Sequence, residues 1–177
     1  MADLVDRMKR AAKLDPNLYE EVEADKTAMG QATLVVVLAS LAAGIGSISQ
    51  GGSAGIIWGT VAALIGWYIW AFLTYIIGTK ILPTSETSAT YGELLRTIGF
   101  SSTPGLIRVL GIIPGLNLIV NMIAGVWMLI AMVIAVRQAL DYTSTGRAVG
   151  VCIIGFIVQI IIMMIFTALF VGAKMSM

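Results

Sequence analysis

Few residues in this chain carry groups that could do chemistry, and the most informative is Arg108. It borders an uncharged stretch, Val109–Val136, that is apolar enough to cross a membrane. An arginine in a membrane span pairs with another group, lines a polar cavity or extends its side chain to the headgroups. Because no acidic residue occurs in the predicted spans apart from Glu93 at the start of the third, its expected partner is a backbone carbonyl, Asn117 or Asn121, a lipid phosphate or another chain.

Asn117 and Asn121 are four residues apart and so share one face of a helix that begins there. Two interpretations stay open. In one, Arg108, Asn117 and Asn121 form a polar site inside the membrane. In the other, Arg108 reaches the outer headgroups and the two asparagines cap the turn at Pro114.

Four further side chains are candidate contacts for lipid, a pigment, a quinone or a partner helix. Aromatic residues usually collect at the membrane interfaces, whereas several of these lie near the middle of predicted spans. Gln159 is a lone polar residue in the last span, where it is expected to bond another helix or a subunit. Ordinary packing is the alternative for the aromatic residues. The four are Trp67, Trp70, Trp127 and Gln159.

The composition excludes several classes of function. The chain has no histidine and one cysteine, Cys152, so it has no internal disulfide, no histidine-based zinc or haem site and no Ser-His-Asp catalysis. General acids and bases are missing from the spans, so we expect no enzyme activity and no cofactor. The net charge of +1 gives no reason to expect nucleic acid binding.

The elements that must position these residues follow from the uncharged intervals. Only 12% of the 177 residues are charged, about half the share in a soluble domain. A span needs about 20 apolar residues. We predict an all-α polytopic membrane protein with an amphipathic surface helix at 1–14 and a membrane domain at 15–177. Its five spans are expected at about 29–49, 56–79, 92–113, 118–136 and 149–171, with a turn at 50–55.

The third span is interrupted by Arg96, Pro104 and Arg108. Pro104 and Pro114 are predicted structural breaks, since proline removes a backbone donor and clashes with the preceding turn. Thr90 and Glu93 have the spacing of a capping box at the start of this segment. If the segment dips into the membrane and returns instead, the last two spans reverse their direction.

At the N-terminus, Leu4, Val5 and Met8 share one helical face, and the polar face includes Arg7. Asp15 and Pro16 are expected to cap a second helix that continues into the first span. The positive-inside rule favours a cytoplasmic N-terminus and an external C-terminus. With five spans, the inner charges are Arg7, Lys9, Arg10, Lys13, Lys26, Lys80, Arg96, Arg137 and Arg147, against Lys174 outside.

Small residues four apart recur in the first two spans. The pairs are typical of helices that approach each other closely. They are Ser40 with Gly44, Ala42 with Gly46, Gly59 with Ala63, and Ala62 with Gly66. We expect these pairs to join the first two spans within one molecule.

Three stretches carry a family resemblance: Tyr91–Pro104, with its Leu-Arg run and Gly-Phe-Ser-Ser-Thr-Pro, then Leu110–Pro114, then Arg137–Ala148 with Ser-Thr-Gly-Arg-Ala. Together with the Asp15-Pro16 start, they resemble the Yip1 domain family over about residues 15–172. The resemblance implies five spans and a cytoplasmic N-terminus. Eukaryotic members bind Rab GTPases and one another and act in membrane traffic. With only about 28 residues before the first span, this chain looks more like bacterial members, and a Rab-type partner is not expected.

These observations predict a non-enzymatic scaffold or accessory subunit of a larger membrane protein complex. Its expected location is the bacterial cytoplasmic membrane, where it would contact lipid and a membrane-protein partner and could shape the bilayer. The alternative is a small transporter that uses the broken third span, because broken helices can line substrate sites.

Overall fold

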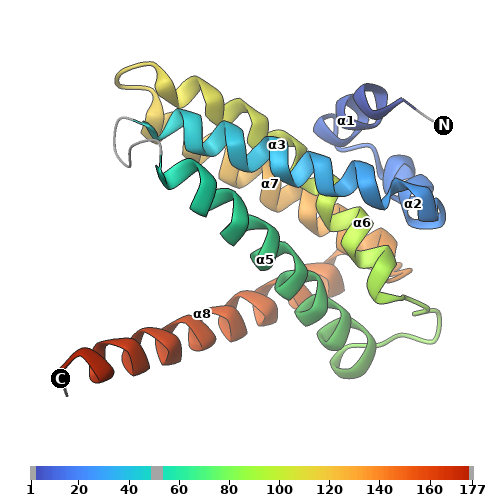
Figure 1. Ribbon diagram of the computed structural model, residues 1–177. Coiled ribbons are helices and arrows are strands. Elements are labelled where there is room, and N and C mark those ends of the chain that lie inside the picture. Colours follow the sequence, from blue (N-terminus) through green and yellow to red (C-terminus); the bar gives the residue numbers. More distant parts are fainter. Residues whose placement is uncertain (1–2, 49–53, 176–177) are drawn as a thin grey trace.

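The computed structural model describes residues 3–48 and 54–175, in which every regular element is helical (Figure 1). The predicted turn at 50–55, the end of the first predicted span and both chain ends fall partly outside these residues. In chain order the elements are α1 (Leu4–Ala12), α2 (Pro16–Ala24), the 3₁₀ turn η1 (Lys26–Ala28), α3 (Met29–Gly46), α5 (Ala54–Ile76), the π-helical turn η2 (Ile77–Ile81), α6 (Tyr91–Ser101), the 3₁₀ helix η3 (Thr103–Ile112), α7 (Asn117–Ala139) and α8 (Thr145–Met175).

Within the described residues, four helices are long and apolar enough to cross a membrane: Lys26–Gly46, Gly55–Ile81, Asn117–Ala139 and Thr145–Ile162. They correspond to the first, second, fourth and fifth predicted spans. The predicted third span differs, because it is not one continuous helix. It consists of α6 and η3, which run one after the other between α3 and α7 (Figure 1).

The break in this segment has a local cause. α6 starts with the predicted capping box, in which Thr90 Oγ1 accepts from the Glu93 N–H at 3.3 Å and the Thr90 N–H donates to Glu93 Oε2 at 2.7 Å. It ends at Ser101, and Pro104 occupies the first turn of η3, where a missing N–H costs nothing. The narrower η3 then packs tightly against its neighbours: a Cβ on Gly105 would lie 2.9 Å from Met128 Sδ.

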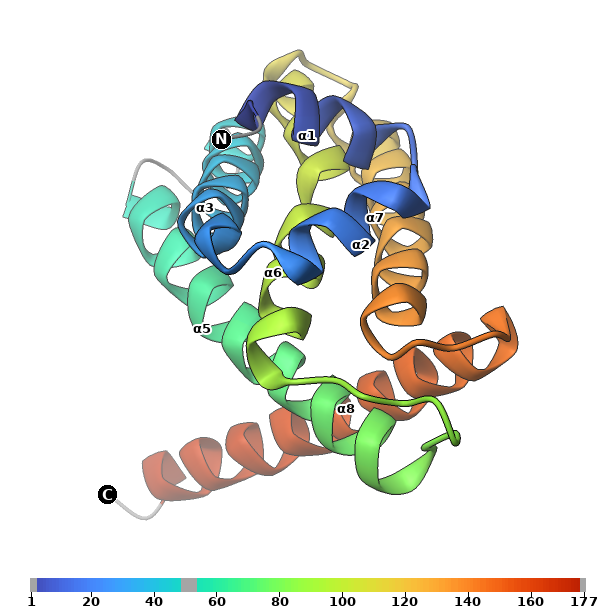
Figure 2. The ribbon, with the colours of Figure 1, turned by 90° about the vertical axis from the view of Figure 1, so that its right-hand side faces the viewer.

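Helices α1 and α2 fold back across one end of the bundle (Figure 2). Asp15 caps α2 through the Asn17 N–H at 3.0 Å and Pro16 is its first residue, as predicted. The expectation that α2 continues into the first span is wrong, because α2 stops at Ala24 and Asp25 caps the separate turn η1. The predicted faces of α1 also need correction: Arg7 is buried and Val5 is exposed.

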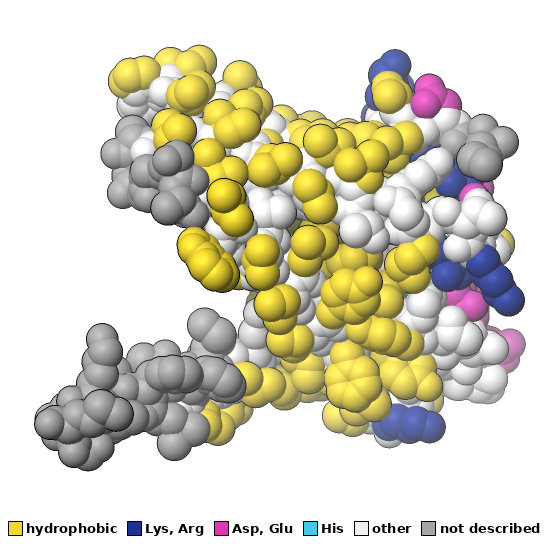
Figure 3. All heavy atoms as spheres, viewed as in Figure 1, with side chains coloured by type: hydrophobic (Ala, Val, Ile, Leu, Met, Phe, Trp, Pro, Cys, Tyr) yellow, Lys and Arg dark blue, Asp and Glu magenta, His cyan; other side chains and the backbone are white. Residues whose placement is uncertain are grey.

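Helix α8 diverges from the rest of the bundle along its length (Figure 1). Its first half is anchored: Tyr142, in the loop before it, donates from its hydroxyl to the Leu82 carbonyl at 2.6 Å, and Phe156 lies 4.6 Å from the Trp70 ring, centroid to centroid. Beyond Phe156 the described side chains are largely exposed and apolar. In Figure 3 the visible charged side chains lie on the right-hand side, away from the free end of α8. Most of them lie over and below α1 and α2.

Candidate functional site

Four of the sequence-predicted candidates meet at one cavity of about 370 Å³. Residues from α3, α5, α7 and α8, and from the α6–η3 segment, surround it, and most of its lining is apolar. Among the described residues that line it, none is acidic. The lining residues are Val36, Ala39, Ser40, Ala43, Gly44, Gly59, Ala63, Gly66, Trp67, Trp70, Ile98, Ser102, Arg108, Met128, Met132, Phe156 and Gln159.

Arg108 is the cation of this cavity. It lies in the middle of η3, at the level of the last turn of α3, because its backbone carbonyl is next to Gly46. Its Nε atom is buried and has no hydrogen-bond partner in the part of the chain that the structure describes. A guanidinium keeps its charge at any ordinary pH and carries five N–H donors. The structure therefore holds a cation in an apolar cavity without a counter-ion among the described residues that line it.

The three candidate tryptophans have different surroundings. Trp67 and Trp70 both line the cavity from α5 and are 5% and 7% exposed. Trp67 donates from Nε1 to the Leu95 carbonyl at 3.0 Å, whereas Trp70 Nε1 is buried and has no partner within residues 3–48 and 54–175. Trp127 lies elsewhere: its Nε1 donates to the Ala12 carbonyl at 2.9 Å and so fastens the end of α1 to α7.

The two asparagines do not join Arg108 in a polar site. Asn117 donates from Nδ2 to the Gly46 carbonyl at 2.8 Å, at the end of α3. Asn121 donates to the Asn117 carbonyl at 2.8 Å and its side chain lies 3.3 Å from Asn117 Oδ1. Pro114 precedes them in the turn between η3 and α7, where Gly115 has a φ of +84° that suits glycine. Both asparagines thus donate to backbone carbonyls, and neither is among the described residues that line the cavity.

The small residues of α5 only partly do what their spacing predicts. A Cβ on Gly44 would lie 3.2 Å from the Ile56 Cα, so α3 and α5 are in close contact at that end. At Gly59 and Gly66 an added Cβ would meet nothing within 4 Å. These two glycines face the open space of the cavity instead of packing against α3, which corrects the expectation that all the small pairs join the two helices.

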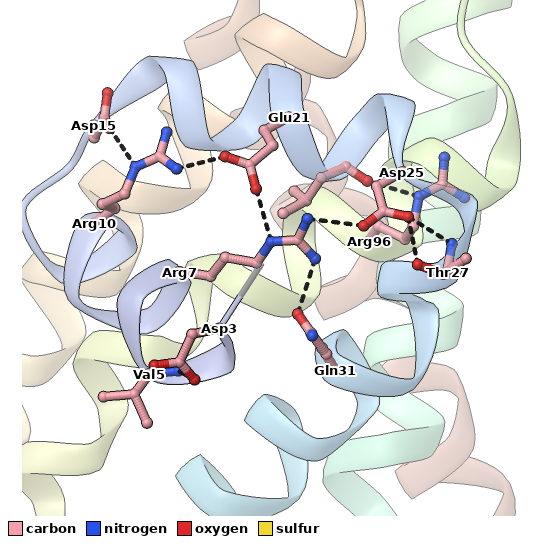
Figure 4. A network of polar contacts seen from close by, with 11 residues as sticks. Asp3, Val5, Arg7, Arg10, Asp15, Glu21, Asp25, Thr27, Gln31 and Arg96 are labelled. Carbon is pink, nitrogen blue, oxygen red and sulfur yellow. Dashed lines mark hydrogen bonds and ion pairs between the residues drawn. The ribbon is translucent and has the colours of Figure 1, made fainter. Parts of the chain in front are cut away.

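A second polar cluster, which the sequence did not reveal, surrounds Arg7 (Figure 4). The Arg7 guanidinium is 3% exposed and donates to Glu21 at 2.8 Å, to Asp25 at 2.8 Å and to Gln31 at 2.9 Å. A hydrogen bond from Thr27, and to a lesser extent one from Arg7, lowers the pKa of Asp25 to about 2. The cluster joins α1 and α2 to the first turn of α3.

Arg96 performs a similar task from α6. Its guanidinium is buried and donates to the carbonyls of Val22, at 2.8 Å, and Glu23, which are orphan carbonyls at the end of α2. Glu23 itself has a buried Oε2 that finds no partner among the described residues. Burial, followed by the charges of Asp141 and Glu20, raises the pKa of its carboxyl to about 8. One sequence pattern is consistent with ion pairs between α1 and α2: four basic residues at 7–13 precede five acidic ones at 15–25.

The geometry of the cavity suits binding better than catalysis. Its polar groups are donors or neutral groups, and the cavity lacks the paired acid and base that proton transfer needs among its described lining residues. In the described part of the chain, no three His, Cys, Asp or Glu side chains gather to hold a metal ion. An anion with an apolar body is the kind of ligand that this donor set would accept.

The comparisons with known proteins agree with the membrane fold. The family model of the Yip1 domain matches residues 18–167, which includes α2 to most of α8 and the whole cavity. No curated protein and no solved structure matches the chain. Since the match extends over most of its length, the chain belongs to the Yip1 domain family of membrane proteins.

Proposed function

We propose that this protein is a non-enzymatic membrane scaffold or accessory subunit that holds a transmembrane helix of a partner protein against α8. In this proposal the chain crosses a bacterial cytoplasmic membrane five times, with α6 and η3 together forming the third crossing. The N-terminus is cytoplasmic and the C-terminus external.

Two observations support the five crossings. α6 and η3 extend along α3 and α7, and the successive long segments alternate in direction, so that the labelled chain ends lie at opposite ends of the molecule (Figure 1). The charged residues gather at the end that carries α1 and α2, as expected for a cytoplasmic face (Figure 3). A cysteine at Ser176, in a Cys152→Ser background, is expected to react with an impermeant reagent added outside the cell. Labelling only after the membrane is opened would contradict this topology.

The exposure of α8 carries the scaffold proposal. Ile153, Ile157, Ile160 and Ile161 are 46–57% exposed, and their spacing of four, seven and eight residues places them on one face of the helix. A membrane helix gains little from burial against lipid and associates with other helices through packing. A span that leaves its own bundle therefore offers a partner helix an unobstructed surface, while its first half fixes the partner's position.

The test uses photo-crosslinking amino acids in native membranes. We expect crosslinks from Ile157 and Ile161 to one membrane protein, which also copurifies at a fixed ratio in mild detergent. The matched control is Ile119, which is 54% exposed on α7 and should crosslink mainly to lipid. Replacing Ile157 and Ile161 by tryptophan should release the copurified protein, whereas Ile119→Trp should not. Equal crosslinking from α7 and α8, or a protein that purifies alone, would contradict the proposal.

A small transporter is the second candidate, and the broken third segment favours it. η3 places Arg108 in the cavity, and an interrupted helix beside a cavity is a feature of some transporters. Transport would require flux of an anionic substrate into liposomes that contain the purified protein alone, with the flux lost in Arg108→Ala. A flux-free protein that binds its partner through α8 would support the scaffold instead.

A further inference from the structure

We propose that the cavity around Arg108 is a binding site for one membrane phospholipid, with the lipid phosphate on the Arg108 guanidinium. The inference concerns a ligand of this chain and does not depend on the scaffold role of α8. It is based on three independent observations: an unmatched cation, an unmatched buried donor and an open channel lined by glycines.

The first observation is the unmatched cation, Arg108. Among the described residues, Arg108 Nε is buried without a partner and no acidic residue lines the cavity. An arginine in apolar surroundings is strongly unfavourable unless a counter-charge or several acceptors complete it. A phosphate supplies both, because it accepts two parallel hydrogen bonds from the planar guanidinium.

The second observation is Trp70. It is 7% exposed, it lines the same cavity, and no described residue supplies an acceptor for its Nε1. Three residues earlier, Trp67 lines the cavity too, but its Nε1 is satisfied by the Leu95 carbonyl. Buried indole N–H groups usually find an acceptor. An oxygen of a bound molecule, such as a lipid ester carbonyl, would complete Trp70 in the same way.

The third observation is the shape of the cavity. Gly59, Gly66 and Trp70 lie on one face of α5, and an added Cβ at either glycine would meet open space. From Gly59 to Trp70 the helix rises about 16 Å, at 1.5 Å per residue. Arg108 stands at the end of this channel where α3 finishes, close to the expected headgroup level, and Trp70 with Phe156 stands deeper. A polar end near the surface and an apolar continuation match a phospholipid with one chain directed inward.

The lipid would also connect the helix bundle with the diverging helix α8. Phe156 and Gln159 contribute the α8 wall, opposite the α3 and α5 walls. A phospholipid in this place would fill the space between the bundle and the diverging helix, and it would be held by groups that have no other partner among the described residues.

The test is native mass spectrometry of the full-length, delipidated protein titrated with dioleoylphosphatidylglycerol. We expect one lipid to bind more tightly than the rest. Its affinity should fall at least tenfold in Arg108→Gln and less in Trp70→Phe, which keeps the ring and loses the N–H. Gly66→Leu should abolish this binding by filling the channel without touching Arg108. Arg147→Gln is the matched control, because Arg147 is an exposed arginine outside the cavity and its loss should leave the affinity unchanged.

Competition identifies the source of the anion. Sodium oleate and inorganic phosphate are added in separate titrations, and we expect neither to displace the tight lipid at concentrations equal to it. Displacement by oleate would mean a fatty-acid site, and displacement by phosphate would mean a simple anion site. Either result overturns the proposal, as does unchanged lipid affinity in both Arg108→Gln and Gly66→Leu. If Arg108→Gln does not fold, as judged by its thermal midpoint, Gly66→Leu and Trp70→Phe decide the question.

Discussion

Asn117 donates a hydrogen bond of 2.8 Å from its side-chain amide to the carbonyl of Gly46, and so joins the first residue of α7 to the last residue of α3. Gly46 would otherwise leave one of the orphan carbonyls at the end of a helix unsatisfied. The same glycine lets η3 approach closely, because the Arg108 carbonyl occupies the space where a Cβ would be. These two contacts of Gly46 therefore fix the end of α3, the middle of η3 and the start of α7, and with them the position of Arg108.

Asn117→Ala is expected to lower the stability of the folded protein by about 1 kcal/mol, since hydrogen bonds between membrane helices contribute about this much. The unfolding midpoint in detergent, followed by tryptophan fluorescence, should fall. Asn121→Ala is the control, because Asn121 donates only to Asn117 and its loss should have a smaller effect. Equal midpoints for the two variants would show that the bond to Gly46 contributes nothing particular.

Gly46→Ala should be more damaging than the loss of the hydrogen bond. The added methyl group would overlap the backbone carbonyl of Arg108, which cannot rotate away as a side chain could, and overpacking of this kind costs about 1–3 kcal/mol. Gly125→Ala, in the middle of α7, is the matched control, because an added Cβ there meets nothing within 4 Å and gains up to about 1 kcal/mol of helix propensity. The two alanine variants should therefore shift the thermal midpoint in opposite directions.

Arg7→Met tests the cluster that joins the N-terminal helices to the bundle. Breaking a buried ion pair costs about 3–5 kcal/mol, and the lower end of that range is expected here because the Glu21 and Asp25 side chains are 33% and 28% exposed. Limited proteolysis should then cut the chain near residues 13–15, between α1 and α2, faster than in the unmodified protein. Lys9→Met removes an exposed charge from the same helix and should change neither the cleavage rate nor the midpoint.

The features that sequence predicts well in this chain are those fixed by neighbouring residues. The capping box at Thr90 and Glu93 and the Asp15-Pro16 helix start are satisfied within three residues, so their spacing is sufficient evidence. Four of the predicted spans agree in type with long apolar helices, because length and apolar character are properties of one segment. The Yip1 family was also predictable, since its motifs are short local patterns.

Other features depend on which distant segments meet. Helical periodicity assigned Arg7 to the solvent face, because nothing in residues 1–14 indicates that α2 returns over this side with Glu21 and Asp25. The sequence singled out Arg108, Trp67, Trp70 and Gln159 as candidates, but it could not show that they line one cavity. It also grouped Arg108 with Asn117, although η3 points the arginine side chain into the cavity while Asn117 serves Gly46.

Glu23 gives the protein a dependence on pH opposite in sign to that of Asp15, Glu21 and Asp25, whose pKa values are lowered. Burial and the neighbouring acids Asp141, Glu20 and Glu93 raise its pKa to about 8, and Arg96 only partly offsets them. A carboxyl with a raised folded-state pKa stabilises the fold while it is protonated in the folded state. Its contribution is complete below the unfolded value of 4.5 and is lost as the pH rises through about 8.

The thermal midpoint in detergent is therefore expected to fall between pH 5 and pH 8 and to level off above that. In Glu23→Gln the neutral amide imitates the protonated acid, so the midpoint should stay level across this range and exceed that of the unmodified protein at pH 8. The control is Glu86→Gln, an exposed residue in the loop before α6, which should retain the decline. A decline that persists in Glu23→Gln would assign the pH dependence to other groups, because this variant has no carboxyl left at position 23 to ionise.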